Sequence, residues 1–181
     1  MNELPKRKAI RIANYDYSTP GAYFITVCAN DRKPILWNVG AATCRPESHG
    51  APNVGAAICR QNLSKIGSVV ETAILQIPEH YPMISVDKYC VMPDHIHMIL
   101  SINTNEDGRQ IAAPTVSTIV GHMNRWVSMQ IGHSIWQKSF IDRVIRNDQG
   151  YRAVWEYIEN NPIKLDTAYD RPDFENMSIV V

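Results

Sequence analysis

The sequence of 181 residues has little cysteine, no excess of charge of either sign and no long apolar run. Its four cysteines include no Cys-x-x-Cys pair, which argues against a cysteine-rich zinc site and favours free thiols in a reducing compartment. No uninterrupted apolar stretch approaches the roughly 20 residues that cross a bilayer. Residues 1–11 are polar and basic and lack the apolar segment of a signal peptide. We therefore expect a cytoplasmic protein with no membrane partner.

The charges balance, with 18 lysines and arginines against 18 aspartates and glutamates. This balance argues against a protein that binds nucleic acid over its whole surface, but it allows a local basic patch. On charge alone, a solvated face is the more frequent explanation of such a cluster. Two stretches are locally basic, and their positive residues are Lys6, Arg7, Lys8 and Arg11 in the first and Arg125, Lys138, Arg143, Arg146 and Arg152 in the second.

The length suits one compact domain, which we take to cover residues 1–181. Within it, the segment Val39–Arg45 nearly recurs as Val54–Arg60, with glycine, proline, serine and asparagine between the two copies. Two copies at so short a period do not make a solenoid. We predict that residues 39–61 form a flexible surface insert that the core does not need.

The hydrophobic patterns predict alternating strands and helices. Strands are expected over 21–29, 84–92, 95–102 and 135–145, and helices over 63–77, 115–131 and 148–161. Ser64 is a suitable N-cap, Pro93-Asp94 suits a hairpin turn, and Pro162 is expected to end the last helix. This order favours an α+β sandwich with helices packed on a mostly antiparallel sheet. The ferredoxin-like split βαβ arrangement is the nearest named form.

Two histidines, His95 and His97, flank one apolar residue in a run that is typical of a buried strand. Side chains two apart on a strand point the same way, so both imidazoles would project together and could bind one divalent metal ion. A His-x-His pair in a strand is more often structural, with one ring buried and satisfied. A β-barrel metal enzyme would need further ligands just downstream, and the next carboxylate, Glu106, lies in an expected loop.

A later helix offers Tyr157 and Asn161, which are four residues apart and share one helix face. Tyrosine can act as a nucleophile, but its phenol has a pKa near 10 and needs help to attack a phosphate. A metal ion held by the two histidines and the Asn161 amide oxygen could polarise that phosphate. The alternative for Tyr157 is an amphipathic residue at the edge of the core.

Three motifs and two opening segments of the chain resemble those of a known family. The segment from Met92 to His97 resembles the HUH motif, in which two histidines surround one hydrophobic residue, of single-strand tyrosine transposases. The similarity is strongest to REP-associated tyrosine transposases of the IS200-like group, and it runs from about Arg11 to Pro162 with the insert interrupting it. The other segments that carry it are Trp136–Asn147, Tyr157–Pro162, Asn14–Tyr17 and Tyr23–Val27.

The resemblance implies a ferredoxin-like HUH domain that cleaves and rejoins single-stranded hairpin DNA of palindromic repeats. Tyr157 would attack a DNA phosphate, forming a 5′-phosphotyrosine bond and freeing a 3′-hydroxyl, while His95, His97 and Asn161 hold Mg²⁺ or Mn²⁺. Tyr151 is the weaker candidate nucleophile, because it lies one and a half turns earlier and so on roughly the opposite helix face. A homodimer is one oligomeric state that the family allows.

The resemblance also gives weight to the basic and aromatic residues as a DNA surface. Trp136 and Phe140 could stack on unpaired bases, although core packing explains them equally well. The insert and the neutral charge suit a domesticated hairpin-binding protein with little or no cleavage, whereas the intact catalytic set favours an enzyme. A metal enzyme acting on a small molecule is the third alternative. The residues expected to contact DNA phosphates are Lys6, Arg7, Lys8, Arg11, Lys138, Arg143, Arg146 and Arg152.

Overall fold

The computed structural model describes residues 15–38, 63–104 and 114–164. The predictions for the basic arm (Lys6, Arg7, Lys8 and Arg11) and for the insert at 39–61 lie outside these residues. The elements in chain order are β1 Gly21–Cys28, η1 Asn30–Arg32, α2 Lys65–Leu75, α3 Ile77–His80, β2 Ile84–Val91, β3 His95–Ile102, α4 Val116–Ile131, β4 Ile141–Ile145 and α5 Asp148–Lys164.

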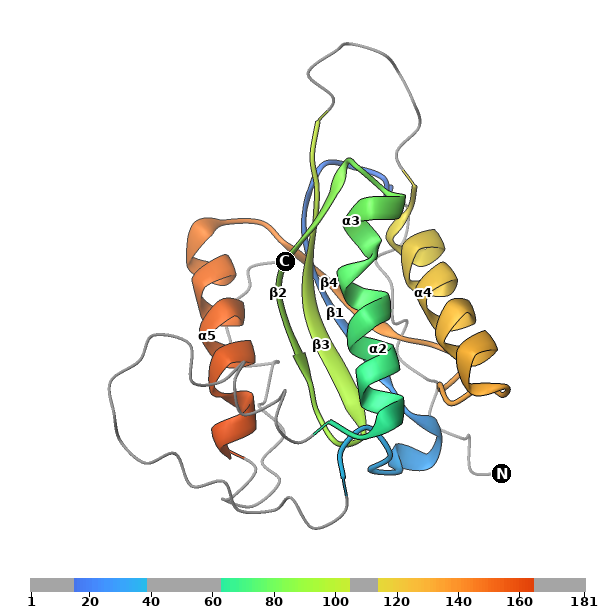
Figure 1. Ribbon diagram of the computed structural model, residues 1–181. Coiled ribbons are helices and arrows are strands. Elements are labelled where there is room, and N and C mark those ends of the chain that lie inside the picture. The colour runs from blue at the N-terminus through green and yellow to red at the C-terminus, as the bar shows by residue number, and fades with distance from the viewer. Residues whose placement is uncertain (1–14, 39–62, 105–113, 165–181) are drawn as a thin grey trace, which may run out of the picture.

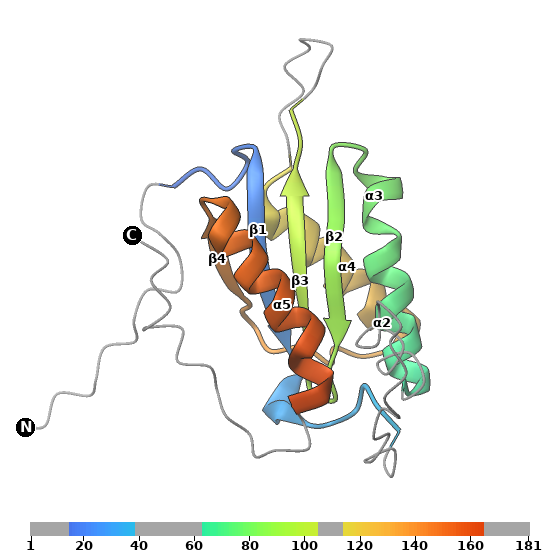
Figure 2. The same cartoon turned by 90° about the vertical axis from the view of Figure 1, so that its left-hand side faces the viewer.

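The four strands form one sheet in the order β2-β3-β1-β4, and every neighbouring pair is antiparallel. Helices α2 and α4 cover one face of the sheet and α5 covers the other (Figure 1). The view turned by 90° shows α5 crossing in front of the strands and α4 behind them (Figure 2). The predicted α+β sandwich of the split βαβ type is therefore confirmed. Among the described helices, none has the length and apolar character needed to cross a membrane.

Strand β1 divides its side chains between two hydrophobic clusters, as the twofold period of a strand requires. Tyr23, Ile25 and Val27 enter the larger core under α2 and α4, while Phe24 faces α5. The cluster under α5 has fewer buried side chains than the larger core, so its hydrophobic stabilisation is smaller. Each fully buried large apolar side chain contributes about 1.5–3 kcal/mol. The buried members of this smaller cluster are Phe24, Cys90, Met92, Ile99, Val154 and Ile158.

Polar contacts supplement this smaller cluster and tie α5 to strand β2. Lys88 Nζ lies 3.5 Å from Glu159 Oε1 and 4.7 Å from the centre of the Trp155 ring. Nearer the start of α5, the Tyr151 hydroxyl donates to Asp87 Oδ2 at 3.0 Å. Helix α5 is thus fixed along its length, which matters because it carries Tyr157.

The helix starts follow from local chemistry. Ser64 Oγ accepts from the Gly67 backbone N–H at 3.0 Å, as its predicted N-cap role requires, and Thr115 Oγ1 accepts from Thr118 N–H at 3.2 Å. Position 67 must be glycine, because a Cβ there would lie 2.0 Å from the Leu36 carbonyl oxygen. These contacts fix α2 against the segment that follows β1.

Two predicted boundaries were wrong. The strand expected over 135–145 begins only at Ile141, because the preceding residues cross the end of β1, where Gln137 N–H donates to Cys28 O at 2.9 Å. Pro162 does not end α5, which continues to Lys164. Proline there stands in the last turn, where the missing N–H removes a single backbone bond.

Candidate active site

The sheet register gathers polar side chains on the face that α5 covers. His97 lies opposite Thr26 of β1 and Cys90 of β2, and residues directly opposite one another project from the same face. His97 is only 4% exposed. His95 lies beside it, and the two Nε2 atoms are 3.0 Å apart. The strand prediction that both imidazoles project together is confirmed.

Helix α5 places Tyr157 directly over this pair. The Tyr157 hydroxyl lies 3.2 Å from His97 Nε2, and the two ring centres are 5.2 Å apart. Phe24 stacks on the His97 ring at 5.2 Å and meets the Tyr157 ring edge-on at 5.9 Å. The structure therefore brings together three predicted site residues, His95, His97 and Tyr157. The Phe24 ring packs against His97 and Tyr157 and restricts how their rings can turn.

Each histidine has a partner on its other ring nitrogen. Asp94 Oδ1 accepts from His95 Nδ1 at 2.5 Å, which leaves the His95 Nε2 lone pair facing the site. Thr26 Oγ1 lies 2.8 Å from His97 Nδ1. When that Nδ1 donates to the threonine, the Nε2 lone pair of His97 faces the same point. Partners of this kind fix the tautomer and orientation of metal-binding histidines.

The electrostatics keep His97 neutral and Asp94 ionised. Burial lowers the pKa of His97 well below its ordinary value, and the charges of His95 and Arg32 lower it further. Burial alone would raise the pKa of Asp94, but the hydrogen bond from His95 and the charges of His95 and Arg32 outweigh it and lower that pKa. The neutral imidazole, as at His97, is the form in which histidine binds metal ions.

The separation of the two imidazole nitrogens fits ligation of one divalent ion. Neighbouring ligands of an octahedral ion with bonds of about 2.1 Å lie about 3.0 Å apart, and the two Nε2 atoms lie at that separation. Asn161, the third predicted ligand, has a buried amide Nδ2 without a hydrogen-bond partner among the described residues, and the amide can turn so that its oxygen takes that position. None of the contacts described above joins it to the histidines. Within the described residues, no three His, Cys, Asp or Glu side chains form a metal site. To hold an ion, the pair would therefore need further ligands, such as the predicted Asn161 or oxygens from outside the protein.

Tyr151 is not part of this arrangement. Its hydroxyl donates to Asp87, and burial together with that bond raises the pKa of Tyr151 to about 12. The prediction that it faces away from Tyr157 was wrong, because both rings pack against the cluster under α5. Six residues at 3.6 per turn leave the two side chains about 120° apart, so long aromatic rings can both reach the sheet.

The residues predicted to contact DNA differ in how far they are exposed to solvent. Trp136 is 5% exposed within the larger core, and the half-buried Phe140 packs against the same core, which favours the core-packing interpretation of both. Lys138 and Arg146 are exposed. Arg143 is half-buried and lies opposite Phe24 on the sheet, so it projects from the α5 face.

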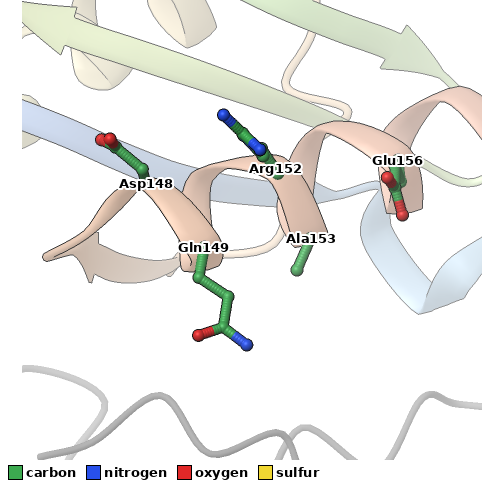
Figure 3. Close-up of a pocket in the computed structure, with 5 residues that line it drawn as sticks. All are labelled: Asp148, Gln149, Arg152, Ala153 and Glu156. Atoms are coloured by element: carbon green, nitrogen blue, oxygen red, sulfur yellow. The ribbon is translucent and has the colours of Figure 1, made fainter.

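Arg152 is exposed and lines a shallow pocket of about 420 Å³ on α5 with Asp148, Gln149, Ala153 and Glu156 (Figure 3). Asp148 and Glu156 stand four residues before and after the arginine on the helix. Two carboxylates beside one guanidinium weaken the attraction of that pocket for a phosphate. Arg152 is therefore the least favoured of the predicted phosphate contacts on this part of the chain.

Sequence reasoning missed four supporting residues, namely Phe24, Thr26, Arg32 and Asp94. Asp94 had a usable signal, because it immediately precedes the first histidine. Thr26 and Phe24 had only their alternation along β1, and their contacts with His97 depend on strand pairing between distant segments. Arg32 had no signal in the sequence.

Comparison with known proteins places this arrangement in context. The model of the family described as "Transposase IS200 like" matches residues 58–161, which is more than half of the chain. A Haemophilus influenzae protein described as uncharacterized is 26% identical over 177 residues, covering 87% of this chain and 88% of its own. A second Haemophilus influenzae protein, provisionally named a REP-associated tyrosine transposase, is 26% identical over 165 residues, covering 84% of this chain and 77% of its own.

One solved structure shares the fold. It is described as a REP-associated tyrosine transposase bound to a REP hairpin, and it aligns with a TM-score of 0.53 at 20% identity. The alignment covers 91% of this chain and 74% of that one. At this identity the likeness shows the fold alone.

Proposed function

Because the chain belongs to the IS200-like transposase family, we propose that it cleaves and rejoins single-stranded DNA by transesterification through Tyr157. The observation that carries this proposal is the meeting of three groups: two Nε2 atoms 3.0 Å apart, with the Tyr157 hydroxyl 3.2 Å from one of them. A half-buried tyrosine hydroxyl next to two oriented imidazoles has little use in a purely structural helix.

The nucleophile works by exchanging one phosphodiester bond for another. The Tyr157 oxygen attacks the DNA phosphorus, a bond forms between them, and the bond to the 3′-oxygen breaks. The phenol must first leave its contact with His97 and release its proton to solvent, and the departing 3′-oxygen takes up a proton. Attack by a 3′-hydroxyl on the phosphotyrosine reverses the step and joins the strands.

His95, His97 and Asn161 are the residues that would hold Mg²⁺ or Mn²⁺. Such an ion would polarise the phosphate and offset the negative charge that develops during attack. Asp94 and Thr26 contribute by fixing the two ring orientations, since each partners the Nδ1 atom on the far side of its histidine.

The relatives and three basic residues near the end of the chain support one substrate class. One similar protein is provisionally named a REP-associated tyrosine transposase, and the structural neighbour is described with a REP hairpin bound. We propose hairpin-forming single strands as the substrate here, with Lys138, Arg143 and Arg146 as phosphate contacts. Binding without cleavage, as in a domesticated copy, remains the rival, and no contact among the described residues favours it.

The test uses the full chain with labelled single-stranded hairpin oligonucleotides and Mn²⁺. We expect a covalent protein–DNA adduct with the natural protein and with Tyr151→Phe, and none with Tyr157→Phe. Tyr151→Phe is the matched control, because it removes a hydroxyl from the same helix without touching the histidines. Binding to hairpins with no adduct from the natural protein would refute cleavage and support the domesticated alternative.

A further inference from the structure

The turn after β1 has an unusual backbone. Asp31 and Arg32 are consecutive residues with φ values of 55° and 54°, in the left-handed region, and neither is glycine. A non-glycine residue held there costs on the order of 1–3 kcal/mol and persists only where the surrounding structure fixes it. Such outliers are a reason to ask what the turn holds in place.

The turn is bound to the loop that precedes the histidines. Ala29 N–H donates to Asp94 O at 2.8 Å, and Leu36 N–H donates to Pro93 O at 2.9 Å. Within the turn, Arg32 N–H donates to Ala29 O at 3.1 Å. These bonds hold the segment on both sides of Arg32 against the Pro93-Asp94 turn.

The strained conformation delivers the Arg32 side chain to the carboxylate behind His95. Arg32 Nη1 lies 3.3 Å from Asp94 Oδ2, while Asp94 Oδ1 accepts from His95 Nδ1. The Asp94 side chain is 12% exposed and the Arg32 side chain 34%. A carboxylate held through one oxygen alone can rotate, whereas one held through both keeps its plane.

We propose that Arg32 is a positioning residue of the candidate metal site. Its guanidinium fixes the Asp94 carboxylate, which fixes the Nδ1–H tautomer and the ring angle of His95, so that His95 Nε2 faces His97. This proposal rests on the proposed function, because in both the two histidines serve to bind a metal ion. It assigns a role in that function to a turn that lies 62 residues from its carboxylate partner.

Two measurements on the full chain test it. Calorimetric titration with Mn²⁺ alone should show at least about tenfold weaker binding for Arg32→Gln, an intermediate effect for Arg32→Lys, and no change for Lys33→Gln. Lys33 is the matched control, because it is the neighbouring cation in the same turn and its ion pair is with the exposed Asp31. Imidazole ¹⁵N NMR in the metal-free protein should show that Arg32→Gln disturbs the single His95 tautomer of the natural protein.

The outcomes separate the possibilities. If Arg32→Gln keeps the natural Mn²⁺ affinity and the His95 tautomer, the proposal is overturned. If Arg32→Gln loses only its affinity for DNA, Arg32 is a direct DNA contact and the proposal is again overturned. A uniform loss of thermal stability without either change also overturns it. A disturbed tautomer in a protein whose natural form binds no Mn²⁺ would support the positioning role and refute the metal-dependent function.

Discussion

Replacing Thr26 with valine removes the hydroxyl beside His97 Nδ1 and nearly conserves the shape of the side chain. The two atoms lie 2.8 Å apart, and their residues are 8% and 4% exposed. A buried polar atom left without its partner costs about 1–3 kcal/mol. At about 2–4 °C per kcal/mol for a chain of this size, the melting temperature should fall by about 2–12 °C.

The same change should weaken the candidate metal site. His97 Nδ1 loses the partner that orients its ring, and loss of such a partner typically lowers metal affinity about 10–100-fold. Thr26→Ser is the matched control, because it keeps the hydroxyl and loses only a methyl group. We expect the serine variant to retain most of the Mn²⁺ affinity.

Calorimetric unfolding in EDTA measures the first effect, and titration with Mn²⁺ measures the second. The two readouts are independent, since the first needs no metal. A valine variant that matches the natural protein in both would refute the assignment of Thr26 as the partner that orients His97.

Three further predictions concern stability, pH and metal removal. Gly67→Ala should lower the free energy of unfolding in urea by at least about 1–3 kcal/mol, because its Cβ would meet the Leu36 carbonyl. Gly121→Ala is the matched control on α4, and it should raise that free energy by up to about 1 kcal/mol, because nothing lies within 4 Å of its Cβ. Equal effects of the two changes would contradict the packing. Because the pKa of His97 is lowered well below 6.5 in the folded state, the unfolded chain takes up the extra proton, so stability in EDTA should be lost as pH falls below 6.5. The slope contributed by this one group is at most about 1.4 kcal/mol per pH unit, and His97→Gln should flatten it; an unchanged slope would place the titration elsewhere. Chelation should abolish the DNA adduct, and excess Mn²⁺ should restore it; adduct formation at full rate in EDTA would exclude a metal requirement.

Much of the fold was predictable because local patterns and tertiary structure agree. In β1, a run of β-forming residues after a turn signal predicts the strand, and Tyr23, Ile25 and Val27 alternate along it with the side chains that face α5. Ser64 caps α2 for a reason that its local sequence contains. The start of β4 could not be predicted in this way, because pairing with the distant β1 decides it.

The candidate site was predictable only in part. The spacing of His95 and His97 is a local signal, but the role of Tyr157 depended on family resemblance, since an isolated tyrosine on an amphipathic helix is ordinary. Thr26 and His97 are 71 positions apart and meet through sheet register alone. Arg32 depends on a backbone conformation that local propensity disfavours, so no sequence pattern indicates it.

The most direct test of the account is to identify the residue that becomes attached to DNA. The protein would be incubated with a hairpin oligonucleotide and Mn²⁺, digested, and the DNA-linked peptide sequenced by mass spectrometry. The account predicts a 5′-phosphotyrosine at Tyr157, in the peptide that also contains Asn161. Attachment at Tyr151 or at any other residue, or cleaved DNA with no linked peptide, would contradict it.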